Sequence, residues 1–297
     1  MNELAVNVTG LRKRYGEVTA VDGLDLGIRR GEVFGLLGPN GAGKSTTVEI
    51  LQGHRTRDSG SVSVLGSDPA TGNRRWRSRI GIVWQDESAP AELTVRETVT
   101  HFARYYPAPR DPGEVIELVG LTPKADSRVK ALSGGQRRRL DVALGVIGGP
   151  ELLLLDEPTT GFDPAARRQF WELIRRLAEE GTTIVLTTHY LQEAEELADR
   201  IAVIARGRVV AEGSPDSLRE RYGSGSTVTW REPDGTHRSE RTPTPTRTVF
   251  ELGRRHRGEV PGLLIDRPSL EDVYLRLTGQ RADASEAPRA HESEVPR

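Results

Sequence analysis

One glycine-rich segment constrains the fold of this chain more than any other feature. Residues 32–37 form a short apolar run, residues 38–46 read GPNGAGKST, and a helical pattern continues from Thr46 to Leu51. The segment fits the spacing G-x-x-x-x-G-K-[ST], which is typical of a loop between a buried strand and the helix that follows it. This order predicts an α/β fold with a mostly parallel sheet.

The chemistry of this loop suits a polyphosphate. Its glycines let consecutive backbone N–H groups turn toward an anion, and the following helix adds the partial positive charge of its N-terminus. Lys44 places a compact charge on the terminal phosphates, and Ser45 offers a hydroxyl to Mg²⁺. We therefore expect ATP and Mg²⁺ as ligands; the alternative is a glycine turn without a ligand. The expected phosphate-binding residues are Gly38, Pro39, Asn40, Gly41, Ala42, Gly43, Lys44, Ser45 and Thr46.

Two carboxylates follow a second apolar run. Residues 152–155 are four leucines, as expected for a strand that is buried on both faces, and Asp156 and Glu157 come directly after them. Open α/β sheets place their ligands at the carboxyl ends of such strands. We expect Asp156 to hold Mg²⁺ and Glu157 to deprotonate the attacking water. The alternative is a strand that ends in an ordinary acidic turn.

A second glycine turn precedes another helix. Leu132 is followed by Ser133, Gly134, Gly135 and Gln136, and a small-residue turn at a helix N-terminus again suits an anion. Since the chain has one nucleotide motif, this turn binds either the same phosphate or one on another copy. The alternative is a helix cap formed by Ser133.

With these motifs the chain resembles the ATP-binding subunit of an ATP-binding-cassette (ABC) transporter, whose signature is LSGGQ. The resemblance implies a P-loop NTPase core of ABC type with an antiparallel β addition and a helical insert, followed by a small C-terminal α/β appendage. It also implies a homodimer that sandwiches two ATP molecules, with the signature of each copy facing the phosphate loop of the other.

The resemblance assigns roles to four further residues. Tyr15 is placed like the aromatic side chain that stacks on adenine, and its alternative is an ordinary core or surface tyrosine. Gln85 resembles the glutamine that contacts Mg²⁺ and water. Asp163 resembles the aspartate that communicates between the two nucleotide sites. His189 resembles the histidine that contacts the γ-phosphate, although a lone histidine after a strand often has no such role.

The remaining pattern predicts the order of the elements. We expect a helix over residues 165–180, a strand over 182–188, a helix over 192–200 and a hairpin formed by 201–205 and 209–211. The arginines at 74–79 and 137–139 are expected to lie on solvated faces; the alternative is a position near anionic lipid. The domain boundaries that we predict are a nucleotide-binding domain over 1–222, its helical insert at about 86–150, an accessory domain over 223–279 and a disordered tail over 280–297.

Composition limits the partners. The 42 basic residues balance 43 acidic ones, which argues against nucleic acid as a partner, and the absence of cysteine excludes disulfides and cysteine-ligated zinc. No run approaches the roughly 20 apolar residues that span a bilayer. The resemblance therefore implies that a separate permease supplies the membrane part, and that this chain lies at the cytoplasmic face of the cell membrane.

The C-terminal segment narrows the family resemblance. Residues 267–279, RPSLEDVYLRLTG, resemble the end of the drug-exporter branch, the daunorubicin-type resistance ATPases, which implies export of a hydrophobic compound or drug. An amphipathic helix capped by Ser269, with Leu270, Val273 and Leu277 on its packed face, would have the same pattern.

Two other functions share the same cassette. A non-transport ABC ATPase acting on the ribosome or DNA is the main alternative, and an inactive regulatory cassette is another. The compact insert and the single cassette argue against the first, and the intact Lys44, Glu157 and His189 argue against the second.

Overall fold

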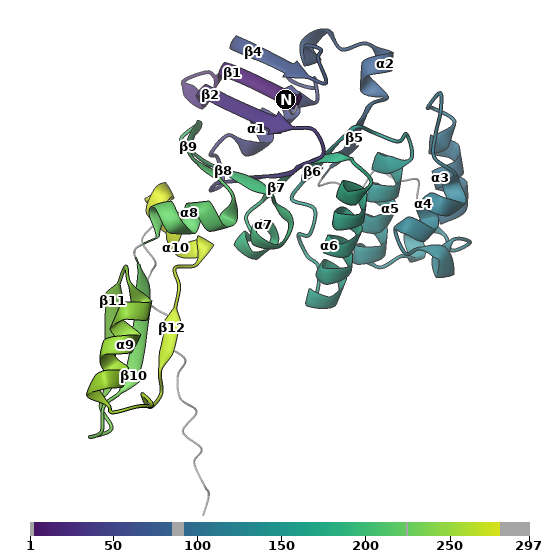
Figure 1. Cartoon of the computed structure of the whole chain (residues 1–297). Coiled ribbons are helices and arrows are strands. Elements are labelled where there is room, and N and C mark those ends of the chain that lie inside the picture. Colours follow the sequence, from purple (N-terminus) through teal and green to yellow (C-terminus); the bar gives the residue numbers. More distant parts are fainter. Residues whose placement is uncertain (1–2, 85–91, 224, 280–297) are drawn as a thin grey trace, which may run out of the picture.

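A six-stranded sheet forms the centre of the computed structural model, which describes residues 3–84, 92–223 and 225–279 (Figure 1). Its strand order is β5-β6-β7-β3-β8-β9, and only β9 runs antiparallel to its neighbour. The strands are β3 (Val33–Leu37), β5 (Ile80–Val83), β6 (Leu152–Asp156), β7 (Thr183–Thr188), β8 (Arg200–Ala205) and β9 (Arg208–Gly213). The predicted parallel sheet and its terminal hairpin are confirmed.

Both faces of this sheet are covered, so its strands are apolar on both sides. In β6, Leu153 and Leu155 pack against helices α5 (Gly134–Val146) and α6 (Pro164–Glu179). Leu152 and Leu154 point to the opposite face, where helix α1 (Lys44–Leu51) and a second sheet lie. All four leucines have no exposed surface. The rigid core therefore fixes the carboxyl end of β6, where the acidic pair begins.

The second sheet is antiparallel and has the order β2-β1-β4. Strands β1 (Leu4–Tyr15) and β2 (Val18–Arg29) are each 12 residues long, and β4 (Ser59–Val64) pairs with β1. This sheet is the antiparallel addition that the family resemblance implies, although the sequence pattern did not place its strands. It lies over α1 in Figure 1.

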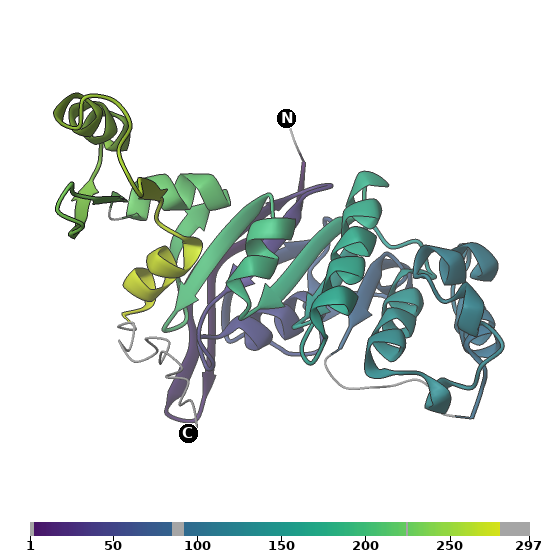
Figure 2. The same cartoon turned by 90° about the horizontal axis from the view of Figure 1, so that it is seen from below.

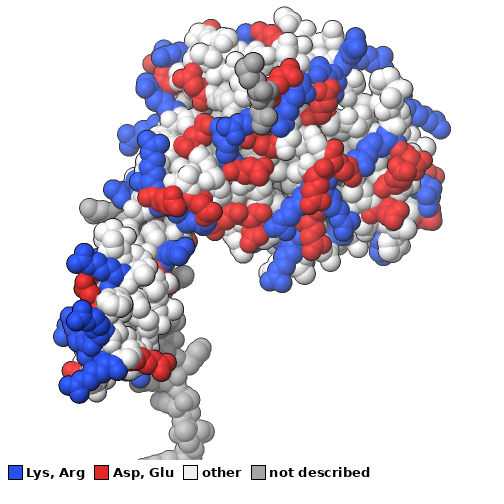
Figure 3. All heavy atoms as spheres, viewed as in Figure 1, with Lys and Arg blue, Asp and Glu red and all other residues white. Residues whose placement is uncertain are grey.

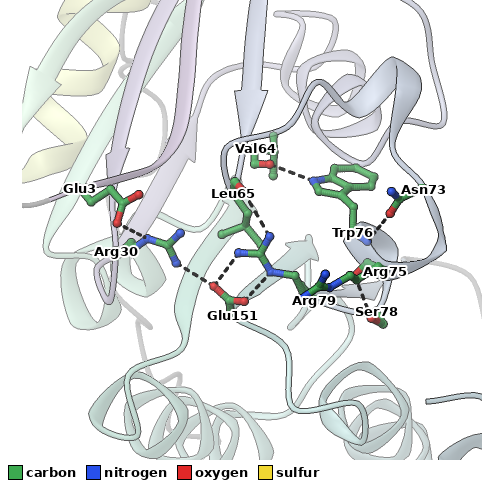
Figure 4. Close-up of polar contacts among 10 residues, drawn as sticks. All are labelled: Glu3, Arg30, Val64, Leu65, Asn73, Arg75, Trp76, Ser78, Arg79 and Glu151. Atoms are coloured by element: carbon green, nitrogen blue, oxygen red, sulfur yellow. Dashed lines mark hydrogen bonds and ion pairs between the residues drawn. The ribbon is translucent and has the colours of Figure 1, made fainter. Parts of the chain in front are cut away.

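A salt-bridge network ties α2 (Arg74–Arg77) and β5 to both sheets (Figure 4). Trp76 donates from its indole nitrogen to the Val64 carbonyl at 2.9 Å. Arg79 and Arg30 both pair with Glu151, which precedes β6. These two guanidinium groups, Arg79 first, hold the pKa of the Glu151 carboxyl down at about 2. Arg79 therefore does not lie on a purely solvated face, as the sequence suggested, because it is one partner of this network.

The helical insert consists of α3 (Val95–Ala103), α4 (Pro112–Leu118) and α5. Thr94 and Glu97 form a capping box at the start of α3, and Asp111 caps α4. Short 3₁₀ helices lie at Pro69–Thr71, Thr122–Lys124 and Val129–Ala131. The insert contributes α5, with its N-terminal glycine turn, to the face of the central sheet.

Helix α7 (Leu191–Leu197) is shorter than the sequence predicted, because β8 already begins at Arg200. Asp199 exchanges two hydrogen bonds with Val33: its carboxylate accepts from the Val33 N–H at 2.9 Å, and its own N–H donates to the Val33 carbonyl. This tertiary pairing with β3 ends the helix before residue 200, where the local pattern alone would have continued it.

The C-terminal part starts with α8 (Pro215–Tyr222) and forms a small sheet of order β11-β10-β12 beside one helix. Its elements are β10 (Ser226–Arg231), β11 (His237–Thr242), α9 (Pro245–Arg255) and β12 (Leu264–Asp266). Asp234 and Gly235 form the turn between β10 and β11, with Gly235 at φ 85°.

Helix α10 (Leu270–Thr278) returns to the main body (Figure 2). Ser269 caps it, and Leu270 and Val273 are fully buried against α8 and β8, as the amphipathic pattern predicted. The helix therefore belongs to the core around α7 and α8 rather than to the small sheet, in contrast to the predicted accessory domain over 223–279. The small sheet has a separate core around Trp230 and Leu252.

Acidic and basic side chains are interspersed over the main body (Figure 3), in keeping with the balanced charge. Within the part of the chain that the structure describes, no helix has the length and apolar character needed to cross a bilayer.

Candidate nucleotide-binding site

The predicted phosphate loop connects β3 to α1 and has room only for glycine at its two ends. A Cβ at Gly38 would lie 2.4 Å from the Ile204 carbonyl oxygen, and one at Gly43 would lie 2.4 Å from the Ala20 carbonyl oxygen. Gly43 also has a φ of 104°, in the region that favours glycine, and it occupies the N-cap of α1. The loop backbone is therefore clamped between β8 and β2, with the N-terminus of α1 at its end.

Lys44 lies along the inside of this loop. Its side chain is almost completely buried, and its ammonium group donates to the carbonyl oxygens of Gly38 at 2.7 Å and Pro39 at 3.3 Å. Burial lowers the pKa of Lys44, whereas the negative charges of Glu157 and Asp156 raise it. The ammonium is thus held between the loop and the carboxylates at the end of β6.

The end of β6 is joined to the end of β7 by Thr187. The Thr187 hydroxyl donates to Asp156 Oδ1, and it accepts from the Glu157 N–H at 3.0 Å. Glu157 has a φ of 43°, which is uncommon for a residue with a side chain and is typical of strained functional sites. This backbone turn separates the two carboxylates, so that each can serve a different task.

The predicted base and the predicted γ-phosphate contact lie together. His189 Nδ1 is 3.2 Å from Glu157 Oε2, and His189 follows directly after β7. The Glu157 side chain is 19% exposed and the His189 side chain is 41% exposed. Both groups are therefore accessible from solvent at the same edge of the sheet, on the side where the phosphate loop ends.

The residues available for a cation fit Mg²⁺. Asp156 offers one carboxylate whose Oδ1 is already oriented by Thr187, and Ser45 is exposed in the first turn of α1. Mg²⁺ usually takes one or two carboxylates together with phosphate oxygens and water, so this sparse set suits a magnesium ion that arrives with a nucleotide. Gln85, the other predicted ligand, lies outside the described residues.

The second glycine turn caps α5. Ser133 Oγ accepts from the Gln136 N–H at 3.3 Å, and Gln136 Oε1 accepts from the Ser133 N–H at 3.1 Å. The capping alternative for Ser133 is therefore observed, and it leaves the N–H groups of Gly134 and Gly135 at the helix end.

This turn faces a cavity of about 450 Å³ that it shares with the loop before α6. Asp163 lines the cavity and caps α6 through the Ala166 N–H at 2.8 Å. None of residues 38–46 is among the described residues that line it. The structure thus brings Asp163 to the signature turn, at a cavity that no described residue of the phosphate loop lines.

Tyr15 lies at the end of β1 with 40% of its surface exposed. Two cations lie over its ring: the Arg55 guanidinium carbon is 5.1 Å and the Lys13 ammonium 5.6 Å from the ring centroid. Tyr15 is therefore not a core residue, and part of its surface is exposed beside these two cations.

Sequence reasoning missed two buried charged residues. Arg138, predicted to lie on a solvated face, is 8% exposed, because it lies on the same helical stripe of α5 as the buried Val142 and Gly145. That spacing is the signal that could have identified it.

Glu193 on α7 has no exposed surface and contacts the Trp171 indole nitrogen at 3.4 Å. Burial raises the pKa of Glu193, against the opposing effect of nearby hydroxyl groups and Arg167.

The chain is similar to known proteins over most of its length. The family model "ABC transporter" matches residues 21–160. The Nod factor export ATP-binding protein I of Ralstonia nicotianae is 42% identical, with 93% of this chain and 94% of the relative covered. The daunorubicin/doxorubicin resistance ATP-binding protein DrrA of Streptomyces peucetius is 40% identical, with 98% and 97% covered.

A solved structure matches the main body. It is the dimeric structure of an ATP-binding cassette in a post-hydrolysis state, bound to ADP and phosphate, and its TM-score is 0.63 at 26% identity. The match covers 70% of this chain and 98% of that one.

Proposed function

The chain belongs to the ABC transporter family as an ATP-binding subunit and ATPase, and we propose that it powers export of a hydrophobic compound through a separate transmembrane permease. The observation that carries the proposal is the convergence of Lys44, Glu157 and His189 at one edge of the sheet. Similarity to two export or resistance proteins over nearly their whole length supports the transport role.

Each of the site residues has a different role in ATP hydrolysis. Lys44 and the loop N–H groups hold the β- and γ-phosphates of ATP, and His189 contacts the γ-phosphate. Glu157 accepts the proton of the attacking water. Asp156 and Ser45 would hold Mg²⁺, together with Gln85, and the ion would supply charge neutralisation at the phosphates. Tyr15 offers its exposed ring to adenine.

The complete site requires two copies of the chain. Ser133, Gly134, Gly135 and Gln136 lie away from the phosphate loop of their own chain, on a cavity shared with Asp163. In a head-to-tail homodimer they would face the γ-phosphate bound by the partner, and Asp163 would lie between the two sites. The dimeric cassette among the similar structures supports this arrangement.

We place the permease contact in a groove between α2 and the end of α3. Two adjoining cavities of about 370 and 650 Å³ share Tyr106. Apolar and aromatic side chains line most of the first, among them Ile82, Trp84 and Phe102, and Arg77 and Asp141 also line it. A permease segment seated here would hold the chain at the cytoplasmic face of the membrane.

The rim of this groove indicates the chemistry of the permease segment. Arg74, Arg75 and Arg104 line the larger cavity and are exposed. Within the described residues, no carboxylate forms an ion pair with any of them, whereas nearby Arg79 is paired with Glu151. We therefore expect the permease segment to carry carboxylates opposite these arginines.

The test is reconstitution in lipid vesicles with the membrane protein encoded beside this chain. We expect candidate hydrophobic compounds to raise the ATPase rate and to move across the bilayer only with ATP. Reversing the charge of Arg74 and Arg75 together should reduce the ratio of ATPase rates with and without the permease, whereas Arg168→Glu on α6 should not. An ATPase rate that neither the permease nor any of the compounds changes would contradict the export role.

A further inference from the structure

Arg138 is a buried cation that donates hydrogen bonds to three main-chain carbonyl groups. Its Nε donates to the Pro158 carbonyl at 3.0 Å, its Nη2 donates to the Asp156 carbonyl at 3.0 Å, and its Nη1 donates to the Trp84 carbonyl. Burial lowers the pKa of Arg138, and the carboxylates of Asp141, Asp156 and Glu193 raise it. A guanidinium stays charged even when burial lowers its pKa, so these carbonyl groups replace the water that Arg138 loses.

Two of the three carbonyl groups flank Glu157, the proposed base. The Asp156 carbonyl belongs to the peptide bond before Glu157, and the Pro158 carbonyl follows it. Glu157 itself has the positive φ of 43°, a strained conformation that persists only where its surroundings enforce it. Thr187 holds the Glu157 N–H from one side, and Arg138 holds both neighbouring carbonyl groups from the other.

The third carbonyl group is that of Trp84, which follows β5. Arg138 itself lies on α5, in the turn after the signature. One planar side chain therefore connects α5, the end of β6 and the segment that leads to Gln85. A lysine could not replace it, because a single ammonium group lacks the rigid fork that spans three carbonyl groups.

We propose that Arg138 is a positioning residue that fixes the backbone of Glu157 and couples it to the signature helix α5. This inference rests on the proposed function, because it takes Glu157 as the base. The N-terminus of α5 faces the nucleotide bound by the partner, whereas Arg138 acts on the base for the chain's own nucleotide. Movement of α5 when the partner binds ATP is thereby transmitted to the other site.

The kinetic test is a double-mutant cycle on the isolated chain. Arg138→Met should lower kcat by about tenfold or more through loss of alignment, with the Kd for ATP changed less than about threefold. In the Glu157→Gln background the same substitution should cause no further loss, because Arg138 acts through Glu157. Independent, multiplicative losses in the double variant would overturn the proposal, as would an unchanged kcat in Arg138→Met. Arg168→Met, at an exposed position on α6, is the matched control.

A second measurement needs no catalysis. Amide hydrogen exchange of the nucleotide-free chain should rise in peptides that cover residues 152–160 in Arg138→Met, and also in Arg138→Lys if the methionine variant does not fold. The Arg168→Met control should match the wild type. Unchanged exchange in the Arg138 variants would overturn the coupling. A wild-type chain that fails to hydrolyse ATP would instead contradict the proposed function, and the exchange result would still decide the role of Arg138.

Discussion

Glu157 occupies a strained backbone position between a buried strand and a solvent-accessible edge, in contact with His189. A carboxylate held in this way can accept the proton of an attacking water, whereas an amide of the same shape cannot. Glu157→Gln should therefore retain ATP binding and lose about 10²-fold or more in kcat. Turnover close to that of the wild type in a phosphate-release assay would exclude Glu157 as the base.

Glu193 allows a second prediction, on the dependence of stability on pH. Burial raises its pKa above 4.5 in the folded chain, so the folded state keeps a proton that the unfolded state loses. The stabilisation is thus present below pH 4.5 and is lost as pH rises through the folded pKa. Glu193→Gln, which does not titrate, should gain free energy of unfolding relative to the wild type as pH rises.

Urea unfolding of both proteins at about pH 5 and pH 8 measures this difference. A variant that loses more stability at pH 8 than at pH 5 would show that Glu193 is ionised and paired with Arg167.

Whether a residue's role or burial can be predicted from the sequence depends on how far along the chain the residues that determine it lie. Roles for Lys44, Asp156 and Glu157 can be proposed from the sequence because their chemistry depends on neighbours within a few positions of the chain. The burial of Arg138 depends on strands β5 and β6, which are distant in sequence, so the local run of three arginines predicts a solvated face. The roles of all these site residues, and of Tyr15, Gln85 and Asp163, remain predictions.

At the scale of elements, Glu151 joins β5, β6 and the antiparallel sheet through Arg79 and Arg30 (Figure 4). Its pKa of about 2 lies below the ordinary 4.5, so its contribution to stability is present above pH 4.5 and is lost as pH falls toward 2. Because 41% of the side chain remains exposed, screening by water reduces the contribution to about 1 kcal/mol.

Glu151→Gln should accordingly lower the free energy of unfolding by about 1 kcal/mol at pH 7, and by progressively less as pH falls below 4.5. Urea unfolding as a function of pH measures the difference, with Glu251→Gln on the exposed face of α9 as a control. A constant difference at all pH values would contradict the assignment of the charge pair.

Elements with strong local periodicity were predicted well, among them α6, β6 and the β8–β9 hairpin. Strands β1 and β2 were not placed, because charged and glycine residues interrupt their alternation and long-range pairing sets their register. The end of α7 was wrong for a similar reason, since Asp199 pairs with Val33 across the sheet.

At the scale of the whole molecule, the separation of the signature turn from the phosphate loop predicts ATP-dependent dimerisation. The Glu157→Gln variant with Mg-ATP should form a dimer in analytical ultracentrifugation, because the sandwich can close but cannot hydrolyse its ligand. Ser133→Arg should prevent dimerisation without weakening ATP binding by the monomer. A variant that stays monomeric at saturating ATP would contradict the shared site.

The most direct measurement of the central claim is calorimetric titration of ATP into the purified chain, with and without Mg²⁺, alongside Lys44→Ala. We expect saturable binding by the wild type that is tighter with Mg²⁺. Loss of the Lys44 charge should weaken it by about 10- to 100-fold, as expected for a hydrogen bond to a charged group. Equal affinities of the two proteins, or no heat of binding from the wild type, would contradict the assignment of this loop as the ATP site.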